Sequence, residues 1–171
     1  MTPATTARSI LTRVRRLLTV GMLAAVVLPA VSAAREGAPN DGTLSVRDAR
    51  GVITVTARGS VIGNFAQGRM KIVDPTEGDG TGPIVSGEDF HKEIDEKTDF
   101  YRGTNVRFRL IGGYFKLRIK GSGINLSVVG VGTLTLKGAG TADDGVFSIN
   151  GGDQVPILNF PLTFPLAAPT P

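Results

Sequence analysis

Cysteine is absent from the 171 residues of this chain, and its absence excludes several kinds of chemistry at once. Without a thiol the protein has no disulfide, no cysteine nucleophile, no cysteine-bound metal and no lipid anchored on cysteine. Its stability must therefore come from an ordinary hydrophobic core. The length of the chain indicates one domain that is large enough to form such a core.

Tryptophan is also absent and histidine occurs once, which leaves few side chains for an active site. The single histidine, His91, lies among Glu88, Asp89, Glu93 and Asp95, where it is a metal ligand, a general base or a surface residue. We favour the surface residue, because a metal site needs further ligands at fixed spacing. The chain also lacks the G-x-S-x-G motif of serine hydrolases.

Two loops carry carboxylates, but neither has the spacing of a calcium loop. The segments 74–80 and 141–145 depart from the D-x-[DN]-x-[DN]-G pattern. With no tryptophan and two tyrosines, the usual stacking platforms of sugar-binding enzymes are also missing. We expect no catalytic residue, no cofactor and no metal site. The alternative is a carboxylate- or metal-dependent hydrolase that uses the acidic residues of 77–99.

The N-terminal 34 residues have the layout of a secretory signal peptide. Four arginines precede an uncharged apolar run over 17–31, which is too short for a membrane-spanning helix, and small residues follow at 31–34. We expect cleavage near Ala33 or Ala34, a flexible mature N-terminus over 35–42, and a secreted or extracytoplasmic protein of the cell envelope. No transmembrane span is expected after cleavage.

Removal of this leader changes the charge balance. Four of the 19 Lys and Arg residues lie before residue 35, which leaves 15 cations against 15 carboxylates. The net charge of +4 for the whole chain therefore comes from the leader, and it does not favour nucleic acid as a partner.

The remaining chain shows short apolar stretches of period 2 separated by glycine, which is the pattern of β-strands. Eight to nine such strands are expected, at 43–47, 52–57, 61–66, 70–73, 106–111, 114–120, 124–129, 133–137 and 146–149. Gly-x-Gly triplets at 121–123, 130–132 and 138–140 indicate tight connections. We therefore predict an all-β fold, an antiparallel sandwich or a partly closed barrel, with a β-solenoid as the alternative.

A shift of 62 residues superposes 51–68 on 113–130, with matches at Gly51, Gly59, Ser60, Ile62 and Gly68. This match predicts a duplicated four-strand unit within a single domain over 43–158. The first unit covers 43–73, an acidic insert covers 74–104, and the second unit covers 105–137. A proline-rich tail follows over 159–171, and part of it should lie along the domain.

One segment, RFRLIGGYFKLRIKG at 107–121, concentrates positive charge. With a two-residue turn at Gly112-Gly113, its two strands would pair as a hairpin. The predicted buried face is Phe108, Leu110, Phe115, Leu117 and Ile119. The predicted opposite face, a candidate site for an anionic ligand, is Arg107, Arg109, Lys116, Arg118 and Lys120.

Three explanations fit such a basic face. Solvent and salt screen the charges, the acidic insert covers them, or an external polyanion binds them. The third explanation predicts a non-catalytic domain with a binding or structural role. Its partner would be an anionic polymer of the envelope, or another envelope protein.

Overall fold

The computed structural model describes residues 38–76 and 78–169, so the expected signal peptide at 1–34 lies outside the described residues. Within these ranges the chain is all β and contains no helix, and therefore no helix that could cross a membrane. The strands are β1 (Gly42–Val73), β2 (Gly80–Asp95), β3 (Thr98–Gly112), β4 (Tyr114–Gly138), β5 (Val146–Ile149), β6 (Val155–Pro156) and β7 (Leu162–Leu166).

All the strand pairs are antiparallel, and the order β2-β3-β1-β4-β7 is not the order of the sequence. The predicted antiparallel all-β fold is confirmed, and the arrangement of its seven strands is consistent with a sandwich. The solenoid alternative is wrong, because stacked solenoid rungs would pair in parallel. Several expected short strands are continuous: β1 joins the four expected between 43 and 73, and β4 joins the three between 114 and 137.

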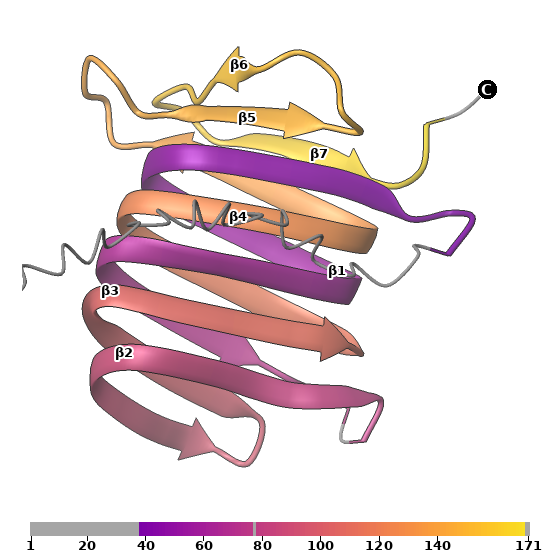
Figure 1. Ribbon diagram of the computed structural model, residues 1–171, viewed down its shortest axis with the longest axis vertical. Coiled ribbons are helices and arrows are strands. Elements are labelled where there is room, and N and C mark those ends of the chain that lie inside the picture. Colours follow the sequence, from indigo (N-terminus) through magenta and orange to yellow (C-terminus); the bar gives the residue numbers. More distant parts are fainter. Residues whose placement is uncertain (1–37, 77, 170–171) are drawn as a thin grey trace, which may run out of the picture. The chain divides into compact units, whose positions relative to one another are not determined.

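The long strands alternate between two layers, as Figure 1 shows for the front and back ribbons. Within β1, residues 51–58 pair with 114–121 on one side and with 131–138 on the other. Residues 59–67 pair with a different set, the segments 104–110 and 122–130. A segment of a sheet has one neighbour on each side, and these two stretches of β1 have different neighbours on both sides. The two successive stretches therefore belong to opposite layers.

We call the two layers A and B and define them by their segments. Layer A contains, in order of pairing, 80–86, 104–112, 59–67, 122–130, 42–49, β5 and β6. Layer B contains 88–95, 98–103, 68–73, 114–121, 51–58, 131–138 and β7.

Glycines stand where a strand passes from one layer to the other. Gly51 has φ +140° and Gly59 has φ +154°, a region that side chains with a Cβ rarely adopt. A Cβ on Gly59 would overlap the carbonyl oxygen of Val129, and one on Gly51 would overlap that of Lys137. The close approach of the paired backbones at these corners therefore requires glycine.

The core lies between the two layers and follows the period-2 pattern. Val55 and Leu117 from layer B and Val61 and Phe65 from layer A are fully buried. All five side chains predicted for the buried face are 3% exposed or less: Phe108, Leu110, Phe115, Leu117 and Ile119. The alternation along each strand was therefore predicted correctly.

Two parts of the chain form strands that the sequence analysis did not name. Residues 74–104, the expected acidic insert, contain β2 and the first half of β3, which pair with each other. In the proline-rich tail, β7 pairs with β4 as the last strand of the order, which confirms that part of the tail lies along the domain. Proline fits such an edge strand because it has no N–H to donate, and the outer side of an edge strand has no neighbouring strand that needs a donor.

Candidate functional site

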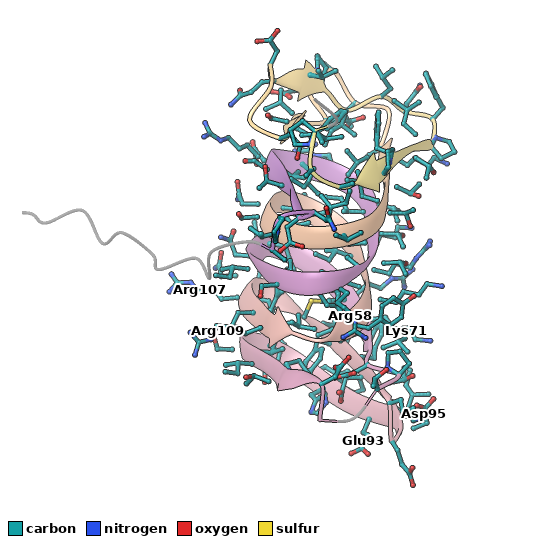
Figure 2. The ribbon with its side chains drawn as sticks, turned by 90° about the vertical axis from the view of Figure 1, so that its right-hand side faces the viewer. Arg58, Lys71, Glu93, Asp95, Arg107 and Arg109 are labelled. Carbon is teal, nitrogen blue, oxygen red and sulfur yellow. The ribbon has the colours of Figure 1, made fainter. Side chains whose placement is uncertain are left out.

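The five cations of the predicted hairpin face do not share one face. The hairpin is wrong, since β1 lies between β3 and β4 in the strand order. Arg109 of β3 pairs with Ile62 and Ile84, whereas Lys116 of β4 pairs with Val73 and Thr56. Figure 2 shows Arg107 and Arg109 on one side of the ribbon and Lys71, a neighbour of Arg118, on the other.

The reason lies in the Gly112-Gly113 pair, which connects the layers instead of closing a hairpin. Both residues have positive φ, +72° and +79°, as a tight turn would require. Residues 104–112 nevertheless belong to layer A and residues 114–121 to layer B. Arg107 and Arg109 therefore lie on the outer surface of layer A, and Lys116, Arg118 and Lys120 on that of layer B.

Layer B gathers further cations beside these three. Arg69 lies opposite Lys120 and Lys71 lies opposite Arg118, while Arg69 also lies opposite Arg102. The buried residues between them, such as Met70 and Ile119, establish that the cations point outward. We call the following eight exposed side chains the basic face: Arg69, Lys71, Lys92, Arg102, Lys116, Arg118, Lys120 and Lys137.

Two rows that run across the strands of layer B contain no carboxylate. The register places Phe90, Arg102, Arg69, Lys120, Val52 and Lys137 in one row. It places Lys92, Phe100, Lys71, Arg118, Thr54, Thr135 and Thr163 in the next. Like charges directly opposite each other destabilise a sheet by a few tenths of a kcal/mol, up to about 1 kcal/mol per pair.

A groove of about 530 Å³ lies between these rows. Arg69, Lys120 and Lys137 line it from the first row, and Lys71 and Arg118 line it from the second. Val52, Thr54 and Thr135 complete its lining in the middle, with Phe100 and Pro161 toward its ends. The groove thus offers five positive charges and two hydroxyl groups in one shallow, solvent-accessible channel.

The acidic residues of β2 and β3 do not cover this face. In the described part of the chain the close contacts between basic and acidic side chains are an ion pair between Arg58 and Asp79, at 3.1 Å, and a hydrogen bond between His91 and Asp99, at 2.7 Å. Neither includes a cation of the basic face or either of Arg107 and Arg109. The explanation in which the insert neutralises the predicted cations is therefore wrong for the arrangement of residues 78–169.

Three of the acidic residues, Asp89, Asp95 and Asp99, have local partners at the β2 end of the molecule, where Figure 2 shows Glu93 and Asp95. The imidazole of His91 stacks on the ring of Tyr101 with centroids 4.5 Å apart, and Thr104 donates a hydrogen bond to Asp89. Burial, together with the charges of Asp99 and Glu88, raises the pKa of the Tyr101 phenol to about 12. His91 is thus part of a hydrogen bond to Asp99 and a ring stack.

The two acidic loops use their carboxylates internally. The Asp144 carboxylate accepts hydrogen bonds from the Thr141 hydroxyl, at 2.5 Å, and from the backbone N–H of Gly140, at 2.6 Å. These bonds lower its pKa below the ordinary 3.8, with the Thr141 hydroxyl as the main cause. In the other loop Asp79 accepts a bond from the backbone N–H of Tyr114. Across residues 38–76 and 78–169, no group of three or more His, Asp and Glu side chains is placed to hold a metal ion.

The outer surface of layer A differs in character. Arg107 and Arg109 line a groove of about 580 Å³ together with Ile62, Ile84 and several serine and asparagine side chains. Ile62 is 53% exposed and Ile84 is 45% exposed, and they lie on either side of Arg109. This groove is lined by three cations, Arg47, Arg107 and Arg109, against five in the groove of the basic face.

The sequence analysis therefore found three of the eight residues of the basic face and missed the other five. Arg69 and Lys71 alternate with the buried Met70 and Ile72, so their outward orientation could have been inferred from period 2 alone. Their position beside Lys120 and Arg118 depends on the register between β1 and β4. No protein-family model, curated protein or solved structure matches this chain, so the functional argument is carried by this geometry.

Proposed function

We propose that this protein is an extracytoplasmic, non-catalytic β domain whose basic face binds an anionic polymer. The observation that carries the proposal is the pair of cross-strand rows in layer B, which hold most of the basic face and no carboxylate. Such a surface attracts negatively charged partners and brings them to the groove.

Selection for stability does not account for this arrangement. The mature chain has 15 carboxylates, enough to neutralise the basic face, yet no carboxylate is paired with it in the described residues. Placing acids opposite Arg69 and Lys71 would replace repulsion by attraction. A surface that keeps unfavourable charge pairs is explained by a ligand that neutralises them when it binds.

The location is inferred from the leader. Arginines, a short apolar run and small residues over 8–34 form the pattern of a secretory signal. A protein exported by such a signal meets the anionic polymers of the cell envelope, which supports an envelope polymer as the partner.

We also propose that the fold arose by duplication of a four-strand unit. Residues 51–58 pair with 114–121, and residues 59–67 pair with 122–130. In each case the 62-residue shift superposes the first segment on its partner to within one residue. Each segment of the first unit therefore pairs with the equivalent segment of the second unit. Such pairing between equivalent segments supports two units related by an approximate two-fold axis.

The function is tested by measuring the binding of the purified protein to a sulfated polysaccharide, a polyuronate and polyphosphate. We expect at least one of the three to bind, with an affinity that falls as the salt concentration rises. The double variant Arg69→Ala/Arg118→Ala should lose this binding. The control Arg107→Ala/Arg109→Ala, which removes the same charge from layer A, should retain it.

Two results would overturn the proposal. One is the absence of binding to all three polyanions at low salt. The other is an equal loss of affinity in both double variants, which would show that only net charge matters.

A further inference from the structure

We infer that the ligand of the basic face is a single acidic polysaccharide chain that lies across the strands of layer B, along the groove between the two rows of cations. This inference rests on the proposed function and adds the class of polymer and its direction on the sheet. The groove, the spacing of the cations and the hydroxyl groups in its lining each contribute to it.

The direction follows from the strands that contribute to the groove. Apart from Phe100 and Pro161 at its ends, its lining comes from 68–73, 114–121, 51–58 and 131–138, which are consecutive segments of layer B. Neighbouring segments are about 4.8 Å apart, so the groove runs about 14 Å from Arg69 to Lys137 across three such steps. A ligand that follows it crosses the strands instead of running along one of them.

The width follows from the alternation along each strand. Lys71 and Arg69 are two residues apart in β1, as are Arg118 and Lys120 in β4, so the two rows lie about 6.7 Å apart at their backbones. That spacing accommodates one polymer chain with cations on both sides. Charged groups that alternate from side to side along the chain would meet both rows.

The class of polymer follows from the uncharged part of the lining. Thr54 and Thr135 each present a hydroxyl that both donates and accepts, and the Thr135 Oγ1 lies 2.9 Å from that of Thr163. A sugar hydroxyl needs a hydrogen-bond acceptor. The threonine hydroxyls can fill that role, whereas the rows beside the groove contain no carboxylate that could. Polyphosphate has no hydroxyl along its chain, so it could accept hydrogen bonds from these threonines but could not donate to them.

The scarcity of aromatic residues is compatible with an acidic sugar and disfavours a single-stranded nucleic acid. Phe100 is the one aromatic side chain in the lining of the groove, whereas non-specific nucleic-acid binding uses a series of stacking platforms. Recognition here would depend on charge and hydroxyl contacts, which an acidic polysaccharide offers along its whole length.

The direction is tested with uronic-acid oligosaccharides of two, four and six residues at one salt concentration. The Lys137→Ala variant should bind the hexasaccharide about three- to fivefold more weakly than the wild type. This is the size of effect expected when one exposed charge contact is lost. Its affinity for the disaccharide, which can remain beside Arg69, Lys71, Arg118 and Lys120, should stay within about twofold of the wild type. Arg118→Ala should weaken the binding of all three oligosaccharides.

The class is tested with Thr54→Val and Thr135→Val, which keep the shape of the side chain and remove its hydroxyl. Both variants should lose more affinity for the hexasaccharide, which can donate to and accept from the hydroxyl, than for polyphosphate, which can only accept from it. Unchanged hexasaccharide binding in both would overturn the acidic sugar as the ligand class. A Lys137→Ala effect that is the same for short and long oligosaccharides, or absent for both, would overturn the direction.

These failures differ from a failure of the proposed function. If polyphosphate binds, Arg69→Ala/Arg118→Ala abolishes the binding and the threonine variants change nothing, the basic face still binds polyanions and the polysaccharide inference alone is wrong. If neither the oligosaccharides, their parent polymers nor polyphosphate binds, the proposed function is wrong as well.

Discussion

Lys71 of β1 and Arg118 of β4 lie directly opposite each other in layer B, with Phe100 and Thr54 as the next members of their row. Both side chains are exposed, and no carboxylate within 38–76 and 78–169 forms an ion pair with either of them. Under the proposed function, the pair is therefore a place where folding and binding have opposite requirements.

Reversal of one of these charges should stabilise the domain and abolish binding. In Arg118→Glu the repulsion from Lys71 and from neighbouring cations becomes attraction, so the free energy of unfolding should rise by a few tenths of a kcal/mol, up to about 1 kcal/mol. Urea denaturation measures this change. Arg107→Glu in layer A, opposite the uncharged Asn64 and Ser86, serves as the matched control and should change stability less.

The core between the layers should be sensitive to truncation of large side chains. Phe115 is 1% exposed, so Phe115→Ala should lower the free energy of unfolding by about 3–5 kcal/mol. The adjacent Tyr114 is 37% exposed and points outward, so Tyr114→Ala should cost far less. Equal losses in the two variants, measured by urea denaturation, would contradict the alternation described for β4.

The corner at Gly59 should not tolerate a Cβ. Gly59→Ala places a methyl group against the carbonyl oxygen of Val129 at φ +154°, so it should destabilise the protein by more than about 1 kcal/mol. Gly82 has no heavy atom within 4 Å of an added Cβ, which makes Gly82→Ala the control. Thermal unfolding of both variants is the measurement, and an unchanged midpoint for Gly59→Ala would show that the two strands can separate there.

The Asp144 carboxylate should contribute to stability at neutral pH and lose that contribution in acid. Hydrogen bonds from Thr141 and Gly140 lower its pKa in the folded protein below the ordinary 3.8. A lowered folded pKa means that the stabilisation is complete above about pH 4 and is lost as the pH falls through the folded value. Asp144→Asn should therefore be less stable than the wild type at pH 7.

The difference between Asp144→Asn and the wild type should shrink below pH 4. Urea denaturation as a function of pH measures it, with Asp153→Asn as a control at an exposed position. A difference that stays constant from pH 7 to pH 2 would show that the carboxylate's charge is not what stabilises the loop.

The sequence alone predicted the features that depend on neighbouring residues within one strand. Alternation of apolar and polar residues predicts which side chains of a strand point to the core, because successive side chains of a strand point in opposite directions. That rule placed Phe108, Leu110, Phe115, Leu117 and Ile119 in the core and Arg118 outside it, and all six positions are confirmed. The all-β class follows from the same period.

Only the tertiary structure decided which strands are neighbours. A Gly-Gly pair permits a hairpin turn and equally a passage between layers, and Gly112-Gly113 makes the passage because β1 occupies the place beside both β3 and β4. The core side chains of 104–112 and 114–121 then face each other from opposite layers, and burying both sets fixes the arrangement. The basic face follows from it, since the partners of Arg118 are Lys71 and Thr54, which lie 47 and 64 residues earlier in the chain.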